Sequence, residues 1–563
     1  MSKKIIMRRI LVLITILLNL TINAQESYSE LTSKAIKIVR SQDSIYYTMA
    51  IDIFDKAFKK YPDSINGTGY YYSSILAASL KQKDKAFKHI TLLAKMETDE
   101  DGYPGWSFVL DEYAKEDYKN LLNDNRWKKL QIQARKDSLT FFKNLEKEKS
   151  EFFKVKETNT LKGKKNENLY QEIKDYNLFL PKEKRNYSIS LKINDSIQTS
   201  YLVHLPKKYN PQKKYPVLFF LHGVVHLSEF ENYQIPEMKL NGWNRFYSKY
   251  SDLNDVILIF PSANKQYNWM TSDDGFFMIP KIVKSIKKSI NIDDNKIFIS
   301  GHSMGATGSF SYSMKEPSLF AGFYGFNSYP KVFTGGTFVE NITNRSFINF
   351  STDQDYYYPP NANDKLDSLM HSLNLDYKDY RYIGFPHGFP EFDESEPAYK
   401  ILFSDLKERE RNPFPKKIMW EFDDNNYGNI DWLTKIKLDT LTSKKTWHKN
   451  LNFHITKELK YNENDSLVEV NVDKKAFNFP RKSGKILANY SNNEFRIKTS
   501  CIESFKIMIS PEMINLKKKV KVYINDKLYF NHKLKYNKDF MVKSFEKTKD
   551  RIQIWINEIV LEI

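Results

Sequence analysis

The spacing of apolar residues divides the chain into three stretches with different periods. From about residue 30 to 135, apolar residues recur at helical intervals, as in AIDIFDKAFKKYP, where Pro62 ends the run. From about 186 to 406, short apolar runs such as YPVLFFLHG and DVILIFPSA alternate with helical segments such as MIPKIVKSIKKSI. From about 413 to 563, short alternating segments such as LVEVNVD, EFRIKTS and KKVKVYIND follow one another. These patterns predict a helical part, an α/β part and an antiparallel β part, in that order.

The three patterns also set the predicted domain boundaries. Residues 25–180 are predicted to form a helical domain that ends in a linker rich in Lys and Glu. Residues 181–412 are predicted to form a doubly wound, mostly parallel sheet, because strands alternate there with helices that cover both faces. Residues 413–563 are predicted to form an antiparallel β-sandwich, since many short alternating strands separated by turns favour that architecture.

The helical domain resembles tetratricopeptide repeats in part of its pattern. Small and aromatic residues recur at helical spacing in two neighbouring segments, which hold Ala50, Phe54, Ala57 and Pro62, and then Tyr72, Ala78 and Ala86. Only one or two units are visible and the consensus Trp and Gly are missing, so a plain helical bundle remains an open alternative. A protein partner, if the chain has one, is expected to bind this domain.

The N-terminus has the three parts of a signal peptide. A basic region precedes an apolar stretch from Ile10 to Ile22, and Ala24 offers a small residue for cleavage. Residues 1–24 are therefore predicted to be a signal peptide, which implies export to the periplasm or the outside of a bacterial cell. No later segment is long and apolar enough to cross a bilayer, so no transmembrane span is expected after cleavage.

Charge and cysteine content narrow the classes of partner. The formal net charge is +18, and Lys is spread through every region beside abundant Asn and Ile. Because the lysines are not concentrated in one part, we interpret the charge as a solvated basic surface and expect no nucleic-acid partner. Cys501 is the only cysteine in the chain, which excludes a disulfide framework and a thiolate metal site.

The segment IFISGHSMGATGS, residues 297–309, is the strongest candidate for chemistry. An apolar strand leads into a G-x-S-x-G turn centred on Ser303 and then into small residues, the strand–turn–helix context of a nucleophilic serine. In this topology the acid and then the histidine follow the serine along the chain. His387 lies in the loop GFPHGFP directly after the strand YRYIGF, whereas His371 lies within a predicted helix. Ser303 and His387 are therefore predicted to be the nucleophile and the base.

The orienting carboxylate is predicted in the segment FINFSTDQDYYYPP, which lies between the serine and the histidine. Asp355 is followed three positions later by Tyr358 and then by Pro359. This spacing is common after the penultimate strand of α/β enzymes that have a nucleophilic serine in a strand–turn–helix context. Asp353 comes directly off the strand and is the alternative acid, although it could instead cap the turn. We favour Asp355 and keep Asp353 open.

The oxyanion hole requires backbone N–H groups beside the reacting carbonyl. Met304 follows the nucleophile at the predicted helix start and supplies one donor by geometry. The second donor is predicted in the loop after the strand YPVLFFL, from Val224 or Gly223. His222 and His302 each stand beside a glycine that a turn requires, and we interpret both as structural.

As a set, these motifs resemble the α/β-hydrolase superfamily. The chain looks most like secreted bacterial esterases that are grouped with feruloyl and acetylxylan esterases and related to S-formylglutathione hydrolase. The resemblance covers about 200 to 390 and rests on LPKKYNPQKKYPVLFFLHG, VILIFPSANKQYNWM, NIDDNKIFISGHSMGATGS, DQDYYYP and PHGF. Two positions depart from the usual pattern: Ala306 replaces a glycine after the motif, and Ser351-Thr352 replaces the glycine before the acid.

The resemblance implies a serine carboxylesterase that works through a Ser303–His387–Asp355 triad and an acyl-enzyme, with no metal and no organic cofactor. The expected substrate is an acyl ester of a small molecule or of a glycan. Four aromatic residues near the predicted site could line an acyl or sugar pocket or could equally be packing under a loop. They are Trp269, Tyr356, Tyr357 and Tyr358.

Two other functions stay open at this point. One is a serine peptidase similar to prolyl oligopeptidase, although that class carries a β-propeller upstream and the segment before residue 180 is helical. The other is a binding protein that uses the hydrolase fold as a scaffold, against which the complete set of triad residues argues.

Overall fold

The computed structural model describes residues 26–41, 43–157, 166–224 and 230–563. The predicted signal peptide, residues 1–24, lies outside the described residues. The chain divides into two compact units, Met1–Asn144 and Leu145–Ile563. Among the helices described, none is long and apolar enough to cross a membrane.

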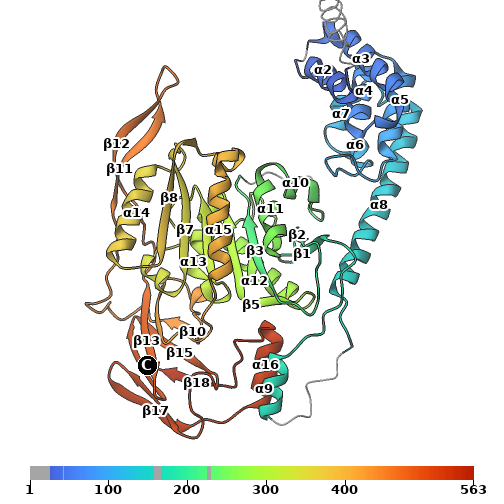
Figure 1. The fold of residues 1–563 in the computed structure, drawn as a ribbon. Coiled ribbons are helices and arrows are strands. Elements are labelled where there is room, and N and C mark those ends of the chain that lie inside the picture. Colours follow the sequence, from blue (N-terminus) through green and yellow to red (C-terminus); the bar gives the residue numbers. More distant parts are fainter. Residues whose placement is uncertain (1–25, 42, 158–165, 225–229) are drawn as a thin grey trace, which may run out of the picture. The chain divides into compact units, whose positions relative to one another are not determined.

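The first unit is built from helices (Figure 1). They are α2 (Tyr28–Arg40), α3 (Tyr47–Lys60), α4 (Gly67–Ser79), α5 (Lys83–Ala94), α6 (Ser107–Leu110), α7 (Ala114–Asp117) and the first part of α8 (Asn125–Phe153). Ser27 starts α2 with a capping box in which it pairs with Glu30. Ala50, Phe54 and Ala57 are buried along one face of α3, as their helical spacing predicts. The likeness to tetratricopeptide repeats stays a prediction.

The division between the units lies well before the predicted boundary at residue 180. The reason is that residues after Leu145 pack into the second unit. Phe152, at the end of α8, is fully buried with its ring 4.9 Å from that of Tyr187. The helix α9 (Asn166–Lys174) places Leu169 and Ile173 in the hydrophobic core of the C-terminal strands. Because Lys and Glu dominate this stretch, its sequence predicts a linker, although a few apolar residues in it pack into the second unit.

The second unit contains an eight-stranded sheet with the order β1-β2-β4-β3-β5-β6-β7-β8. Its strands are β1 (Asn186–Lys192), β2 (Gln198–His204), β3 (Tyr215–Leu221), β4 (Ile257–Pro261), β5 (Ile292–Gly301), β6 (Gly322–Phe326), β7 (Ser346–Gln354) and β8 (Tyr377–Pro386). The β1–β2 and β2–β4 pairs are antiparallel, and every pair from β4 onwards is parallel. The prediction of a mostly parallel α/β sheet is confirmed.

Helices cover both faces of this sheet because the inner strands are apolar on both faces. In β3, Val217, Phe219 and Leu221 face one core and Leu218 and Phe220 face the other. The first core also takes side chains from α12 (Asp273–Ile286), α13 (Met304–Lys315) and α14 (Pro360–Ser372). The second takes side chains from α11 (Arg245–Asn254) and α15 (Glu396–Glu408), while the short α10 (Pro236–Leu240) precedes α11.

The C-terminal strands form a five-stranded sheet, β17-β16-β14-β13-β9, and a three-stranded sheet, β10-β15-β18. The elements are β9 (Lys417–Phe422), β10 (Leu433–Leu438), β13 (Gly484–Ser491), β14 (Glu494–Ser500), β15 (Ile502–Ile509), β16 (Lys519–Ile524), β17 (Lys527–Lys533), α16 (Lys538–Thr548) and β18 (Asn557–Glu562). Both sheets contribute to one hydrophobic core. The prediction of purely antiparallel pairing is wrong at β14 and β16, which pair parallel because the chain passes through β15 in the other sheet between them.

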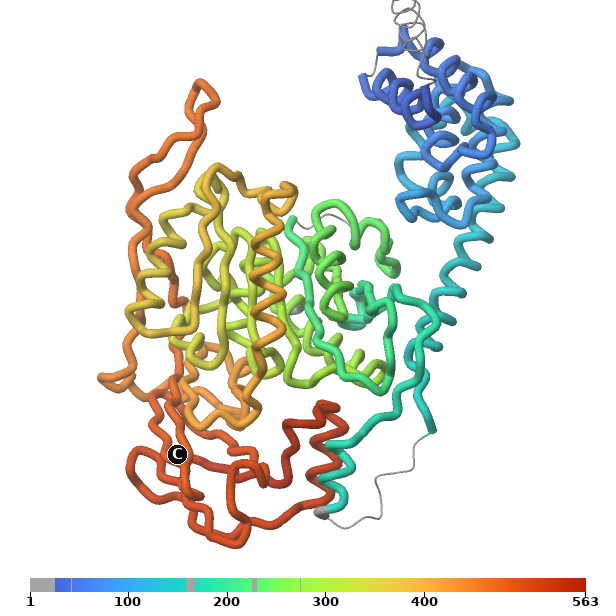
Figure 2. Tube along the Cα trace, viewed as in Figure 1, coloured from blue at the N-terminus to red at the C-terminus, as the bar shows by residue number. Residues whose placement is uncertain are grey.

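A separate two-stranded hairpin, β11 (His454–Tyr461) and β12 (Leu467–Lys475), leaves these sheets and runs along α14 (Figures 1 and 2). Ile455 and Phe477, at its base, are buried in the core that α14 shares with the eight-stranded sheet. The Asn361 side chain near the start of α14 accepts hydrogen bonds from the backbone N–H groups of Thr456, at 2.9 Å, and Lys457, at 3.3 Å. These contacts fix the hairpin on the α/β part of the unit.

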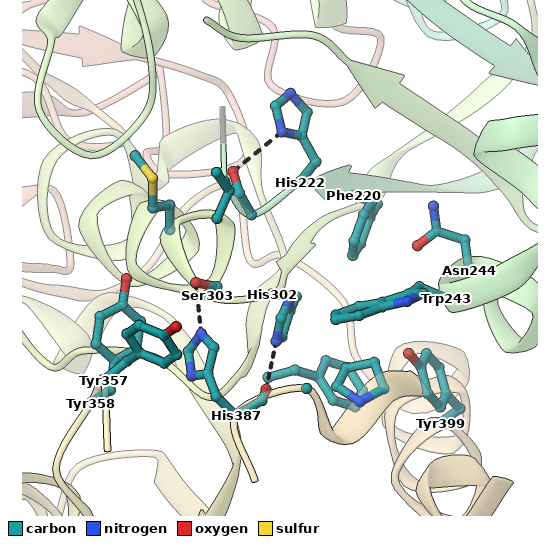
Figure 3. A pocket seen from close by; sticks show the side chains of 16 residues that line it. Phe220, His222, Trp243, Asn244, His302, Ser303, Tyr357, Tyr358, His387 and Tyr399 are labelled. Carbon is teal, nitrogen blue, oxygen red and sulfur yellow. Dashed lines mark hydrogen bonds between the residues drawn. The ribbon is translucent and has the colours of Figure 1, made fainter. Parts of the chain in front are cut away.

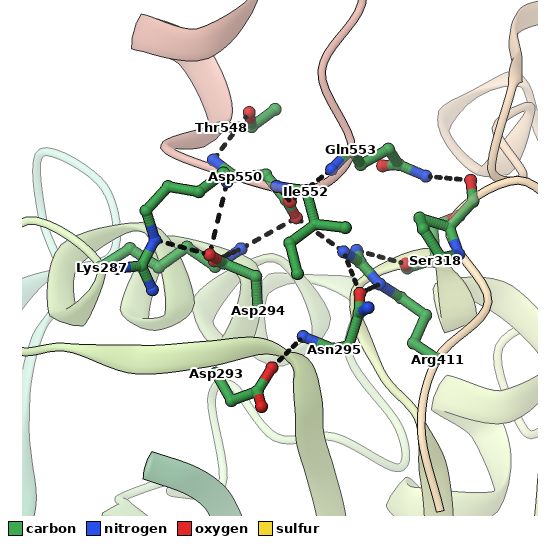
Figure 4. A network of polar contacts seen from close by, with 12 residues as sticks. Lys287, Asp293, Asp294, Asn295, Ser318, Arg411, Thr548, Asp550, Ile552 and Gln553 are labelled. Atoms are coloured by element: carbon green, nitrogen blue, oxygen red, sulfur yellow. Dashed lines mark hydrogen bonds and ion pairs between the residues drawn. The ribbon is translucent and has the colours of Figure 1, made fainter. Parts of the chain in front are cut away.

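A buried network of charges joins the C-terminal segment to the eight-stranded sheet (Figure 4). Asp550 contacts Lys287 at 3.0 Å and Arg411 at 2.9 Å, and Asp294 contacts Lys287 and Arg551, each at 2.8 Å. All five side chains are 3% exposed or less. Burial alone would raise the pKa of Asp550, but the charges of Arg411 and Lys287 hold that pKa well below its usual range. The C-terminal strands are therefore an integral part of the second unit.

Removing one partner from this network leaves uncompensated charges in the interior. Asp550→Ala is expected to lower the free energy of unfolding at pH 7 by about 3–5 kcal/mol, measured by urea denaturation. The matched control is Glu469→Ala, which breaks an exposed 2.6 Å pair with Lys457 and should cost less than about 1 kcal/mol. Equal losses in the two variants would contradict the assigned role of the network.

Candidate active site

Ser303 stands at a sharp turn between β5, which ends at Gly301, and α13, which begins at Met304. Its backbone angles are φ +57° and ψ −121°, in a region that residues with a side chain rarely adopt. Such strain persists only where the surrounding structure enforces it, and it is concentrated at functional sites. The turn directs the Ser303 side chain into a pocket of about 650 Å³.

Two glycines make this turn sterically feasible. A Cβ atom on Gly305 would lie 1.8 Å from the carbonyl oxygen of Leu221 at the end of β3. A Cβ atom on Gly301 would lie 2.3 Å from the carbonyl group of Gly305. Both distances are far below van der Waals contact, so the start of α13 can pack this closely on β3 only with glycine at both positions.

His387 and Asp355 approach Ser303 from the loops after β8 and β7. The Nε2 atom of His387 lies 2.8 Å from Ser303 Oγ (Figure 3). The Nδ1 atom of His387 lies 2.7 Å from an Asp355 carboxylate oxygen. The other Asp355 oxygen accepts hydrogen bonds from the backbone N–H groups of Tyr357 and Tyr358. Asp355 is 2% exposed. The structure thus brings the three predicted residues, Ser303, His387 and Asp355, into one hydrogen-bonded row.

The alternative residues lie elsewhere. The Asp353 carboxylate accepts a hydrogen bond from the backbone N–H of Gly384 at 2.7 Å, so it stabilises the bend in β8. His371 is exposed on α14 and interacts with Asp367 of the same helix. Of the two candidate acids, the structure places Asp355 beside the histidine.

The backbone of His387 is held by two side chains. Its carbonyl oxygen accepts hydrogen bonds from His302 Nε2 at 2.8 Å and from Asn327 Nδ2 at 2.7 Å. Burial, together with the charge of His387, lowers the pKa of His302 to about 3, so His302 is a neutral donor at neutral pH. The sequence indicated only a structural histidine here, and it missed Asn327, whose place after β6 carries no motif.

The oxyanion donors are predicted around Met304 and the loop after β3. Met304 is the first residue of α13, and the first N–H groups of a helix have no partner within the helix. Gly223 and Val224 line the same pocket, and a Cβ atom on Gly223 would lie 3.3 Å from Ser303 Cβ. The loop therefore passes directly beside the nucleophile, as its predicted role requires.

Of the two alternatives left open for Trp269, the structure favours packing under a loop. It is fully buried, and its indole N–H donates to the His222 carbonyl oxygen at 3.2 Å. The His222 ring accepts a hydrogen bond from the backbone N–H of Ala263 at 3.0 Å and packs edge-on against Trp269. Trp269 thus anchors the loop that carries Gly223 and lies outside the pocket lining, whereas His222 both anchors this loop and lines the pocket.

The pocket has two ends, on either side of Ser303 and His387 (Figure 3). Phe220 and Tyr399 are buried and line one end (Figure 3), and the buried Phe326, which also lines the pocket, packs on Tyr399 with 4.7 Å between ring centroids. At the other end lie Tyr357, which is 58% exposed, and Tyr358.

Tyr358 covers the base from one side. Its ring packs edge-on against His387 with 5.0 Å between the ring centroids. Burial raises the pKa of Tyr358, while hydrogen bonding with the Ser303 and Thr307 side chains acts in the opposite direction. Tyr356 lies outside the pocket lining, 36% exposed, and stacks on Tyr357. Within the described parts of the chain, no group of three His, Cys, Asp or Glu residues could hold a metal ion.

Residues 196–329, which include the Ser303 turn, match the family model described as "Putative esterase". No curated protein matches the chain. Three similar solved structures cover 39–40% of this chain. They are a thermostable esterase (21% identity, 64% of that chain, TM-score 0.33), S-formylglutathione hydrolase from Staphylococcus aureus (16%, 99%, 0.30) and a ferulic acid esterase (16%, 98%, 0.32). Over residues 196–329, the family match confirms the predicted resemblance to esterases.

The burial of neutral His302 makes stability depend on pH. Because the pKa is about 3 in the folded chain and near 6.5 in the unfolded chain, the unfolded state binds the extra proton between these values. The stabilisation is complete above pH 6.5 and decreases as the pH falls. His302→Gln is expected to reduce the pH slope of unfolding free energy between pH 5 and 6 by about 1 kcal/mol per pH unit, measured by urea denaturation.

The control for this measurement is His371→Gln at an exposed position of α14, which should leave the slope unchanged. An unaltered slope in His302→Gln would mean that His302 is not a buried neutral group.

Proposed function

We propose that this chain is a serine carboxylic ester hydrolase whose catalytic residues are Ser303, His387 and Asp355. The observation that supports this most directly is the continuous row of hydrogen bonds from Asp355 through His387 to Ser303. The family match over residues 196–329 gives the same reaction class. The substrate is an acyl ester, with the acyl group in the pocket beside Ser303.

In the first half of the reaction, His387 Nε2 takes the proton of Ser303 Oγ as that oxygen attacks the ester carbonyl carbon. The negative charge that forms on the carbonyl oxygen is stabilised by the N–H of Met304 and by an N–H of Gly223 or Val224. When this intermediate collapses, the bond to the alcohol breaks and His387 gives its proton to the leaving oxygen. Asp355 keeps the proton of Nδ1 in place throughout, so Nε2 is free to act as the base.

In the second half, water attacks the Ser303 ester and His387 again accepts a proton and returns it to Ser303 Oγ. The products are a carboxylate and the regenerated enzyme. His302 and Asn327 act through His387, since they hold its backbone carbonyl while the imidazole exchanges protons.

The esterase interpretation accounts for more of the chain than its alternatives. A peptidase similar to prolyl oligopeptidase carries a β-propeller upstream, whereas the elements from Tyr28 to Lys174 are helices. A binding protein on a hydrolase scaffold would not need a strained serine at 2.8 Å from a histidine. We further propose that residues 1–24 direct export to the periplasm or beyond, on the basis of their composition.

Loss of the nucleophile should abolish turnover. Ser303→Ala is expected to lower kcat/KM for p-nitrophenyl acetate and for a methyl cinnamate ester by at least about 10⁴-fold. The matched control is Ser372→Ala, at the exposed end of α14, which should keep full activity. Equal rates for Ser303→Ala and the unaltered chain on every ester tested would rule out the proposed function.

The choice between the two aspartates is tested by paired amide substitutions. Asp355→Asn should reduce kcat by about 10⁴-fold, because the amide no longer holds the required histidine tautomer. Asp353→Asn should change kcat by less than about tenfold, since Asp353 contacts only the β8 backbone at Gly384 in the geometry described. The reverse ranking would move the acid to Asp353.

A further inference from the structure

A row of tyrosine rings leads from the C-terminal hairpin to the proposed catalytic base. Tyr461, the last residue of β11, packs edge-on against Tyr356 with 5.1 Å between ring centroids. Tyr356 lies against Tyr357 at 4.0 Å, and Tyr357 lies 4.9 Å from the ring of His387. Tyr461, which is more than 100 residues from Asp355 in sequence, thus extends the rim of the pocket.

The three rings are open to solvent. Tyr356 is 36% exposed, Tyr357 is 58% exposed and Tyr461 is 56% exposed, so each presents part of an aromatic face. Contiguous exposed aromatic surface beside a pocket contributes little to folding and marks a binding surface. The row is continuous with the pocket, because Tyr357 also lines it.

The hairpin holds its tyrosine in a defined position. Asn361 at the start of α14 fixes the backbone of Thr456 and Lys457, and Ile455 is buried beneath them. Beyond this base, most residues of β11 and β12 are exposed or half-buried. The hairpin therefore adds little to the hydrophobic core, and its main structural effect is to place Tyr461 against Tyr356.

The chemistry of the row suits a sugar ring. A tyrosine offers an apolar face with a hydroxyl group at its edge, and a pyranose likewise has apolar C–H faces with hydroxyl groups at its edges. A lipid surface fits less well, because it would remove water from the ion pairs Lys457–Glu469 and Lys474–Glu458 on the same hairpin. In an acylated glycan only the acyl group needs to enter the pocket, and the sugar stays outside.

We propose that Tyr357, Tyr356 and Tyr461 form the surface on which the carbohydrate alcohol of the ester substrate stacks. The inference rests on the proposed esterase function and adds the class of alcohol. It assigns the C-terminal hairpin a role in substrate selection, with Tyr461 as a specificity-determining residue.

The experiment compares two esters of one acyl group, chosen as the acyl group that the p-nitrophenyl series shows to be hydrolysed. One is the ethyl ester and the other is a mono-ester of a disaccharide. In the full chain, Tyr461→Ala should lower kcat/KM for the disaccharide ester about tenfold, mainly through KM, and leave the ethyl ester within twofold. Tyr461→Phe retains the ring and should retain activity on both esters.

The matched control is Tyr529→Ala, an exposed tyrosine on β17 that should affect neither ester. The inference is overturned if Tyr461→Ala leaves the ratio of the two kcat/KM values unchanged, or if the disaccharide ester is not a substrate while the ethyl ester is. The phenyl ester of the same acid gives a further test. If Tyr461→Ala lowers kcat/KM for the phenyl ester as much as for the disaccharide ester, the inference is overturned, because the surface would then recognise any ring.

A binding measurement separates this inference from the proposed function. Calorimetric titration of Ser303→Ala with the disaccharide ester should show binding that weakens about tenfold when Tyr461→Ala is added. If the unaltered chain hydrolyses no ester faster than Ser303→Ala does, the esterase function fails while this titration still decides the carbohydrate surface. Absence of binding to Ser303→Ala, or binding that is insensitive to Tyr461→Ala, overturns the surface.

Discussion

The close packing of α13 on β3 is the constraint on which the rest of the proposed site depends. Gly305 lies so near the Leu221 carbonyl that no side chain fits between them, and the turn directly before this contact holds Ser303 in a strained conformation. The same turn points Ser303 Oγ into the pocket and places Met304 at the helix start beside it. One steric contact thus positions both the proposed nucleophile and a proposed oxyanion donor, and it does so in the absence of substrate.

Around this turn, the second unit brings together the loops after β7 and β8 and the C-terminal strands, which are far apart in the chain. Asp355 and His387 come from successive loops after β7 and β8, and the carbonyl of His387 is fixed by His302 and Asn327. The C-terminal strands are joined to the sheet by buried charges centred on Asp550. The hairpin β11–β12 is held separately, by Asn361 and by the buried Ile455, and these contacts place Tyr461 beside Tyr356.

Much of the α/β part was predictable, because its strands are short apolar runs that alternate with amphipathic helices. The two compact units divide after Asn144 rather than at the expected residue 180, and a few apolar residues of α9 pack into a core built by strands more than 200 residues later. The parallel pairing of β14 with β16 was also missed. Alternation of apolar residues identifies a strand but not its partner, and pairing depends on the path of the chain between sheets.

In the candidate site, local pattern singled out Ser303 and His387, because a turn needs its glycines and a base needs a loop at the end of a strand. Tertiary structure alone placed Asp355 and not Asp353 beside His387, buried Trp269 under the loop that carries Gly223, and brought Tyr461 to Tyr356. The physical reason is that the type of each local element, whether helix, strand or turn, depends mainly on residues that are close together in the sequence. The direction and contacts of a side chain are set by whichever distant residues pack against it.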